Sequence, residues 1–266
     1  MSDAVIFEKS GHVVTLTLNR PDTRNALDNK VIDAIEAHCA EINRDYEVRA
    51  VIVTGAGKGF SSGGNVKDMR DQKGLFGGSP ANMRHNYRTG IQRIPRVICN
   101  LEVPIIAAIN GAAIGAGLDL ACMCDIRIAA QNAVFAESFC KVGIIPGDGG
   151  AWLLPRVIGM ARASEMIFTG DAIDATTALE YRLVSKVVSQ ESLIEAAQEL
   201  AQRIAVNPPH VLRMAKTLLR EGQKTDLGTL LEMSAAFQAV VQHTDDHREA
   251  VAAMFEHRTP VFSGKI

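Results

Sequence analysis

Two glycine-rich stretches, each directly after an apolar run, have the composition of an anion-binding site. Residues 50–55 read AVIVTG and lead into AGKGFSSGG, and residues 104–111 read PIIAAING and lead into AAIGAG. Glycine lets the main chain approach a ligand closely and turn its N–H groups toward it. In the second stretch these groups also precede an expected helix, where partial positive charge gathers. Two such turns on neighbouring strands could hold one negatively charged oxygen between them.

A second interpretation of the same glycines stays open at this point. Tight turns favour glycine even where no ligand is involved. The string GAGKGF lacks the G-K-[ST] ending of a phosphate-binding P-loop and is not a complete dinucleotide-binding turn. The pattern alone therefore predicts close main-chain approach and leaves its purpose undecided.

Carboxylates near the second glycine stretch are the candidates for proton transfer. Asp119 follows the last glycine by two residues, Asp148 stands in PGDGG, and Glu137 lies between them. Burial against apolar neighbours disfavours the charged form of a carboxyl and suits it to hold a proton. Each has a structural alternative: Asp119 hydrogen-bonded within its helix, Asp148 as a helix N-cap, and Glu137 as a surface acid. His85 is the histidine nearest the expected pocket, and a solvent-facing or structural role is its simpler interpretation.

The composition excludes several classes of function. The chain has 266 residues, of which 47% are apolar and 22% charged, with a net charge of −2. These values predict one large globular domain, or one domain with a smaller extension, and give no electrostatic basis for nucleic acid or membrane partners. The five cysteines form no C-x-x-C pair, so we expect reduced thiols, no metal site and a cytoplasmic protein. We see no signal peptide and no apolar run of membrane-spanning length.

The elements that would position these residues alternate between strands and helices. Residues 4–11 and 12–20 are expected to form a hairpin around Gly11, followed by a helix at 26–44. Further expected elements are strands at 50–55, 104–111, 125–130 and 133–137, and a helix at 116–123. Strand, turn, helix and strand in this order predict layered α/β structure.

Two further segments stand apart from this pattern. Residues 70–95 are polar, rich in glycine and weakly periodic, so they are expected to be a loop over the site or a surface excursion. An amphipathic helix is expected at 192–206, and Asn207-Pro208-Pro209 breaks it. We therefore place a boundary here, with a core at 1–206 and a helical region at 207–266 that packs on the core or on another subunit.

Four stretches in order resemble the crotonase (enoyl-CoA hydratase/isomerase) superfamily along nearly the whole chain. They are LNRPDTRNAL (18–27), AVIVTGAGKGFSSGGNVKDM (50–69), PIIAAINGAAIGAGLDLACMCDIRIA (104–129) and VGIIPGDGGAWLLPRVIG (142–159). The resemblance implies a spiral of ββα units followed by a helical trimerisation region, and hence a homotrimer or a dimer of trimers. It also implies an acyl-CoA thioester substrate, with coenzyme A as part of the substrate and no separate cofactor.

The resemblance also implies roles for individual residues. The main-chain N–H groups of Gly64 and Ala116 would form the oxyanion hole for the thioester oxygen. The implied coenzyme A contacts are Arg24, Asn25, Ala26 and Ser62, with Phe262 and Lys265 reaching the coenzyme A of an adjacent subunit. Arg24 suits a phosphate by charge, although a solvated surface arginine is the alternative.

Members that hydrate enoyl-CoA resemble one another in using two glutamates. Asp119 occupies the position of the first with a side chain one methylene shorter, and Phe139, which cannot move a proton, occupies the second. Some isomerases of the family carry an acid where this chain has Gly147, directly before Asp148. Asp148 is therefore our second catalytic candidate after Asp119, and Glu137 is the alternative.

The leading functional hypothesis is reversible addition of water to a 2-enoyl-CoA through an enolate. The first alternative is an isomerase that moves the double bond by C2 proton transfer, and a hydrolase or C–C lyase acting on an acyl-CoA follows. A non-catalytic acyl-CoA-binding subunit is the alternative from another class. Candidates for the acyl pocket are Met69, Leu75, Phe76, Trp152 and Phe168, each of which could instead serve core packing. The acyl chain itself is not predicted.

Overall fold

The computed structural model describes residues 3–265 and contains two sheets. The six-stranded sheet has the order β1-β2-β3-β5-β7-β10, in which only β1 and β2 pair antiparallel. Its strands are β1 (Val5–Ser10), β2 (Val13–Leu18), β3 (Ala50–Gly55), β5 (Ile105–Ile109), β7 (Ile126–Ala130) and β10 (Lys186–Val188). The expected hairpin around Gly11 and the buried strand at 50–55 are confirmed.

The second sheet explains the spiral. It has the order β4-β6-β8-β9, with β4 (Gly59–Ser61), β6 (Ala112–Ile114), β8 (Val134–Ala136) and β9 (Ile173–Asp174). From β3 to β8, successive strands therefore alternate between the two sheets, and a helical segment follows each of the pairs β3–β4, β5–β6 and β7–β8. The expected spiral of ββα units is confirmed. The turns after β3, β5 and β7 each lead directly into a strand of the small sheet.

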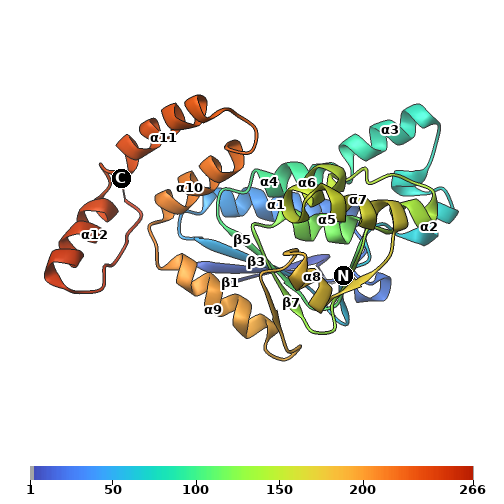
Figure 1. Cartoon of the computed structure of the whole chain (residues 1–266), viewed down its shortest axis with the longest axis horizontal. Coiled ribbons are helices and arrows are strands. Elements are labelled where there is room, and N and C mark those ends of the chain that lie inside the picture. Colours follow the sequence, from blue (N-terminus) through green and yellow to red (C-terminus); the bar gives the residue numbers. More distant parts are fainter. Residues whose placement is uncertain (1–2, 266) are drawn as a thin grey trace.

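Helices cover both faces of the large sheet (Figure 1). On one face α9 (Leu193–Ala205) places Leu193, Ala197 and Ala201 against Ile52 and Ile106, which alternate with core residues of the other face. The larger core lies on that other face, between the sheet and α1 (Asn29–Arg44), α4 (Arg93–Cys99) and α5 (Ala116–Met123). Because β3 and β5 are buried on both sides, their continuous apolar runs are needed for packing.

The segment 70–95 differs from the expected loop. It begins at the last residue of α2 (Val66–Arg70) and contains η2 (Gly74–Phe76), α3 (Pro80–Thr89) and the start of α4. Ser79 caps α3 by accepting a hydrogen bond from the Asn82 N–H, and Pro80 takes the first helical position, where its missing N–H has no cost. The polar composition hid this helix because none of its residues is fully buried.

Three helices complete the core, and three form the C-terminal region. The core helices are α6 (Gly150–Ile158), α7 (Met160–Thr169) and α8 (Ala175–Glu180), and the C-terminal ones are α10 (Pro209–Glu221), α11 (Leu227–Val241) and α12 (Asp245–Glu256). Figure 1 shows α11 and α12 projecting from the sheets, whereas α10 packs on the core. Within residues 3–265, no helix is both long enough and apolar enough to cross a bilayer.

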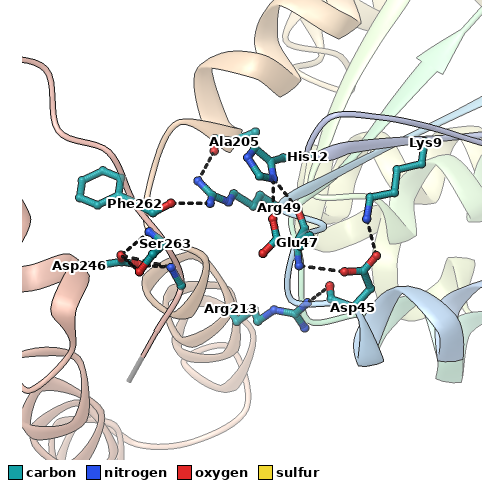
Figure 2. Close-up of polar contacts among 11 residues, drawn as sticks. Lys9, His12, Asp45, Glu47, Arg49, Ala205, Arg213, Asp246, Phe262 and Ser263 are labelled. Atoms are coloured by element: carbon teal, nitrogen blue, oxygen red, sulfur yellow. Dashed lines mark hydrogen bonds and ion pairs between the residues drawn. The ribbon is translucent and has the colours of Figure 1, made fainter.

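Two buried charges tie the C-terminal tail to the rest of the chain (Figure 2). Arg49, at the start of β3, donates to the carbonyl of Ala205 at 3.1 Å and to that of Phe262 at 2.8 Å. The carboxylate of Asp246 accepts the main-chain N–H groups of Ser263 and Gly264. The tail therefore has a defined course beside α12 and the end of α9.

Candidate active site

The two glycine turns lie against each other. A Cβ on Gly63 would stand 2.9 Å from the main-chain nitrogen of Ala116, and one on Gly117 would overlap the carbonyl of Ser61. Gly63 has a φ of +74° and Gly115 of +53°, conformations that glycine adopts without the cost that a side chain would impose. Close approach of main chain to main chain is therefore the reason for these glycines.

This contact leaves two N–H groups at one cavity. Gly64 and Ala116 both line a cavity of about 310 Å³. Among the described residues, neither main-chain N–H has a hydrogen-bond acceptor, whereas the neighbouring Gly63 and Gly115 donate to Ser61 Oγ and the Ala136 carbonyl. Ala116 is also the first residue of α5, so its N–H carries the positive end of the helix dipole. Two free donors from adjacent turns at one cavity have the arrangement of an oxyanion hole.

Apolar side chains from the segment after β4 form most of the remaining wall. Three of the expected acyl-pocket residues, Met69, Leu75 and Phe76, line the cavity together with Tyr87 of α3. Trp152 and Phe168 do not contribute: Trp152 lines a separate hollow beside α10, and Phe168 is 78% exposed. An apolar wall facing two polar donors suits an acyl chain next to a carbonyl group.

Three aspartates line this cavity, Asp28, Asp68 and Asp148, and Asp148 is the buried one among them. Its side chain lines the wall and is only 6% exposed, and burial raises its pKa to about 6. The helix-cap interpretation of Asp148 is wrong, because the cap of α6 is Gly149 and no side chain caps this helix. An acid with a pKa this close to neutral pH, beside the two donors, is suited to take up and return protons.

Asp119 and Glu137 lie behind this wall as a buried pair. Both side chains are 0% exposed, so the surface-acid interpretation of Glu137 is wrong and Asp119 itself has no surface in the cavity. Burial raises the pKa of both, and each carboxyl is a hydrogen-bonding neighbour of the other. The negative charge of Asp148 raises both pKa values further. The three carboxyls thus form one cluster, with Asp148 at its open end.

Phe139 lines the cavity at the position that the resemblance assigns to the second hydratase glutamate. Its ring atoms would stand 3.5 Å from a Cβ on Gly115, and it lines the cavity beside Ala116. A phenyl ring there adds apolar surface and lowers local polarity, which disfavours ionisation of nearby carboxyls. Of the three clustered carboxyls, therefore, only Asp148 lines this wall, and position 139 contributes a phenyl ring instead of a fourth acid.

Comparison with known proteins agrees with this geometry. Residues 8–265 match the family model described as enoyl-CoA hydratase/isomerase. The chain belongs to the enoyl-CoA hydratase/isomerase family. It is 37% identical over 257 residues to a short-chain-enoyl-CoA hydratase of Clostridium acetobutylicum, covering 96% of this chain and 95% of that protein. It is 34% identical over 266 residues to the 1,2-epoxyphenylacetyl-CoA isomerase of Escherichia coli, with 100% of both chains covered.

The fold agrees with solved structures of this enoyl-CoA hydratase/isomerase family. The crystal structure of an enoyl-CoA hydratase from Bacillus anthracis matches with a TM-score of 0.91 at 37% identity, covering 98% of this chain and 99% of that one. A structure described as a putative enoyl-CoA hydratase from Streptomyces coelicolor gives the same TM-score at 34% identity, with 98% and 94% covered. These family enzymes therefore share the complete fold, including the C-terminal helices.

The expected coenzyme A segment runs beside the first glycine turn. The Ser62 N–H donates to the Arg24 carbonyl at 2.9 Å, and the Leu27 N–H donates to the Gly63 carbonyl at 2.9 Å. Arg24 is exposed, Ala26 is buried and Ser62 is half-buried. These bonds hold residues 24–27 directly against the turn that ends at Gly64.

Asn25 has a structural role in this segment. Its side chain accepts a hydrogen bond from the Arg20 N–H and donates to the carbonyls of Ala56 and Gly59, and its own carbonyl accepts the Ser61 hydroxyl. Its main chain has a φ of +56°, which asparagine tolerates better than most residues. Every polar group of Asn25 is therefore occupied in shaping the turn.

Phe262 and Lys265 lie far from this cavity within the chain. Figure 1 shows the C-terminal end beside α11 and α12, at the other end of the molecule from α2 and α3. The Phe262 side chain is half-exposed and Lys265 is exposed. The structure does not bring these two residues to the site of the same chain.

Several site residues were missed by reasoning from the sequence. Tyr87 of α3 lines the cavity, and the cations Lys30 and Lys73 stand at its edge, where an anionic group could meet them. The sequence pattern that could have indicated Tyr87 is the four-residue spacing of Met83, Tyr87 and Ile91. This spacing is typical of a helix, but it is a weak indication in a polar segment. His85, by contrast, is exposed on α3. Among residues 3–265, no group of three His, Cys, Asp or Glu side chains is arranged to hold a metal ion.

Proposed function

We propose that this protein is an enoyl-CoA hydratase that adds water reversibly to a 2-enoyl-CoA thioester. The observation that carries the proposal is the pair of free N–H groups of Gly64 and Ala116 beside the carboxyl of Asp148, in one largely apolar cavity. The names of relatives such as the Clostridium acetobutylicum hydratase support the same reaction.

The reaction follows from three groups. The thioester oxygen is placed between the N–H groups of Gly64 and Ala116, which stabilise the negative charge that develops on it. Asp148, as a carboxylate, accepts a proton from a water molecule while the water oxygen bonds to C3. The resulting enolate takes a proton at C2 from Asp148, which restores the carboxylate and completes the addition of one H and one OH. Asp119 lies behind Asp148 and contributes negative charge to the cluster without touching the water.

An isomerase is the alternative that one observation favours. Only one carboxyl of the cluster, Asp148, has surface in the cavity, because Phe139 occupies the second glutamate position and Asp119 is fully buried. A single carboxyl is sufficient to remove a proton from one carbon of an acyl-CoA and return it to another. The isomerase of Escherichia coli among the relatives supports this alternative.

Product analysis distinguishes these candidates. The purified protein is incubated in D₂O with short-chain, branched and aromatic enoyl-CoAs, and the products are analysed by mass spectrometry. Hydratase activity gives a 3-hydroxyacyl-CoA with deuterium at C2, and isomerase activity gives an enoyl-CoA with a displaced double bond and no added oxygen. Binding of acyl-CoA in a titration with no product from any of these substrates would contradict both and favour a non-catalytic subunit.

The binding and assembly assignments form part of the same proposal. Arg24 and Ser62 would contact coenzyme A beside the first turn, with Asn25 and Ala26 shaping it. Phe262 and Lys265 would reach the coenzyme A of an adjacent subunit in a homotrimer or a dimer of trimers, because they lie far from their own cavity. The division into a core at 1–206 and a helical region at 207–266, and a cytoplasmic location, likewise stay predictions from the sequence.

A further inference from the structure

We propose that Glu137 is a positioning residue that stays protonated and donates its proton in a hydrogen bond to Asp119, thereby fixing the carboxylate behind Asp148. The proposal rests on the proposed function for its catalytic consequence. Its structural part concerns only two buried carboxyls and can be tested without substrate.

The carboxyl oxygens of the pair have no other hydrogen-bond donor within the described chain. None of the four carboxyl oxygens of Asp119 and Glu137 accepts a hydrogen bond from an N–H, hydroxyl or cationic donor within the described chain, and all are shielded from solvent. Two ionised carboxylates side by side in such a site would combine desolvation with mutual repulsion. One proton held between them removes one charge and supplies the missing donor.

The location of the proton follows from the surroundings of each carboxyl. Asp119 lies in the first turn of α5 and packs on Gly150, the first residue of α6, so two helix N-termini favour its negative charge. Glu137 follows β8 and precedes η3 (Ser138–Val142), and the acidic groups Asp119 and Asp148 are its charged neighbours. Burial and these two acids raise the pKa of Glu137, so Glu137 is the acid and Asp119 the base of the pair.

A main-chain hydrogen bond connects the segments that carry Asp119 and Glu137. The Gly115 N–H, directly before α5, donates to the carbonyl of Ala136, the residue before Glu137, at 2.8 Å. The nearby thiol of Cys122 is neutral, because burial raises its pKa. The titratable groups that face the pair are therefore Asp148 and Cys122, and neither supplies a positive charge that would replace the shared proton.

The test compares Glu137→Gln with Glu137→Leu. Gln keeps the shape and can donate its amide N–H to Asp119, whereas Leu fills the space with no donor. We expect E137Q to keep kcat within about threefold, as for replacement of one hydrogen-bond donor by another. We expect E137L to lose about 10- to 100-fold in kcat with little change in KM, because the Asp119 carboxylate loses its only donor. In E137L the acidic limb of the pH profile should also move to higher pH.

Infrared spectroscopy tests the proton directly. At pH 8.5, above the pKa of about 6 of Asp148 and of about 7 of Asp119, the free protein should still show the carbonyl stretch of a protonated carboxylic acid, and this band should be lost in E137Q. The matched control is Glu102→Gln, because Glu102 forms an ion pair with Arg213 at 2.6 Å and is not part of the carboxyl cluster, so its removal should leave the band unchanged.

Specific results would overturn the proposal. A band at pH 8.5 that is unchanged in E137Q would show that Glu137 is ionised. Wild-type kcat and an unchanged pH profile in E137L would show that Asp119 needs no donor, and an equal loss of kcat in E137Q and E137L would show that donation is not the role. If the wild-type protein turned over no enoyl-CoA, the proposed function would fail, while the infrared result would still decide the state of Glu137.

Discussion

Gly150 lacks a side chain at the place where the carboxyl of Asp119 packs against it. A Cβ at position 150 would overlap Oδ1 of Asp119, and the remaining carboxyl atoms would lie within 3.0 Å of it. The first residue of α6 and the buried acid of α5 therefore determine each other's position, although they are 31 residues apart in the sequence (150 − 119 = 31).

The first prediction concerns this contact. Gly150→Ala would ordinarily favour a helix, but here the added methyl group must displace Asp119. We expect a decrease of about 1–3 kcal/mol in the free energy of unfolding, as for overpacking of a close-packed interior. Turnover should also fall. Denaturant unfolding and steady-state kinetics measure the two effects.

A double-mutant cycle provides the control for this prediction. In an Asp119→Ala background the carboxyl is absent, and Gly150→Ala should then cost almost nothing. An equal cost of Gly150→Ala in both backgrounds would show that the methyl group clashes with something other than Asp119.

The second prediction tests the oxyanion hole through the main chain. Ala116→Pro removes one N–H, and the first position of a helix accepts proline without loss of a helical hydrogen bond. We expect the folded structure to persist and kcat to fall about 100- to 1000-fold. Circular dichroism and kinetics check the two parts.

The matched control is Ala116→Gly, which keeps the N–H and should retain activity near that of the parent. If A116P and A116G were equally active, the Ala116 N–H would not contribute to catalysis.

The third prediction follows from the raised pKa of Asp148. Because the proposed base must be ionised, kcat/KM should fall as the pH drops below about 6. The fall is expected at this pH because burial raises the pKa of Asp148 to about 6. Asp148→Asn should lose most turnover at every pH. Measurement of kcat/KM from pH 5 to pH 8 checks this, and an acidic limb near the ordinary aspartate pKa of about 4 would contradict it.

The fourth prediction is that the Asp148 carboxylate, which the proposed reaction needs, lowers the stability of the folded protein. The folded protein binds the Asp148 proton more tightly than the unfolded chain, so the carboxylate lowers stability once the pH exceeds the ordinary aspartate pKa, and the cost is complete above about pH 6. At about 1.4 kcal/mol for each pKa unit, Asp148→Asn should raise the free energy of unfolding by up to about 3 kcal/mol at pH 8. At pH 4 the gain should nearly vanish. A pH-independent gain would mean that the carboxyl charge is not its source.

The fifth prediction concerns assembly. α11 buries no residue within the chain and exposes Leu227, Leu231 and Val240. A charge in an apolar subunit interface is costly, so Leu231→Asp should convert the proposed trimer to monomers without unfolding. Sedimentation velocity measures the mass, and Glu232→Gln on the same helix is the control. A parent protein that is already monomeric would contradict the assembly proposal.

Local patterns made most of the fold predictable. The strand at 50–55 and the helix at 116–123 have the expected bounds, because a continuous apolar run between turns and a glycine-led helix are strong signals. The helix α3 was missed because it lies half in solvent, so no apolar stripe marks it. A short helix of this kind depends on contacts made elsewhere in the fold.

The site was predictable where it is made of main chain and less so where it depends on packing. The glycine turns predicted close approach of the main chain, and the family resemblance assigned the two donors to Gly64 and Ala116, whereas the burial of Glu137 did not follow from its position. Its strand β8 has only three residues, and side-chain alternation over that length does not determine which face is enclosed. The small sheet and η3 enclose it, and both are assembled from distant segments.

Because the two donors at Gly64 and Ala116 belong to the main chain, most codon changes leave them in place. The carboxyls at 119, 137 and 148 and the ring at 139 are side chains that one substitution can replace. Under the proposed function, the molecule thus combines main-chain donors that persist through mutation with a proton acceptor that one substitution can change. A combinatorial library at these four positions should redirect the chemistry while the capacity to hold the substrate persists.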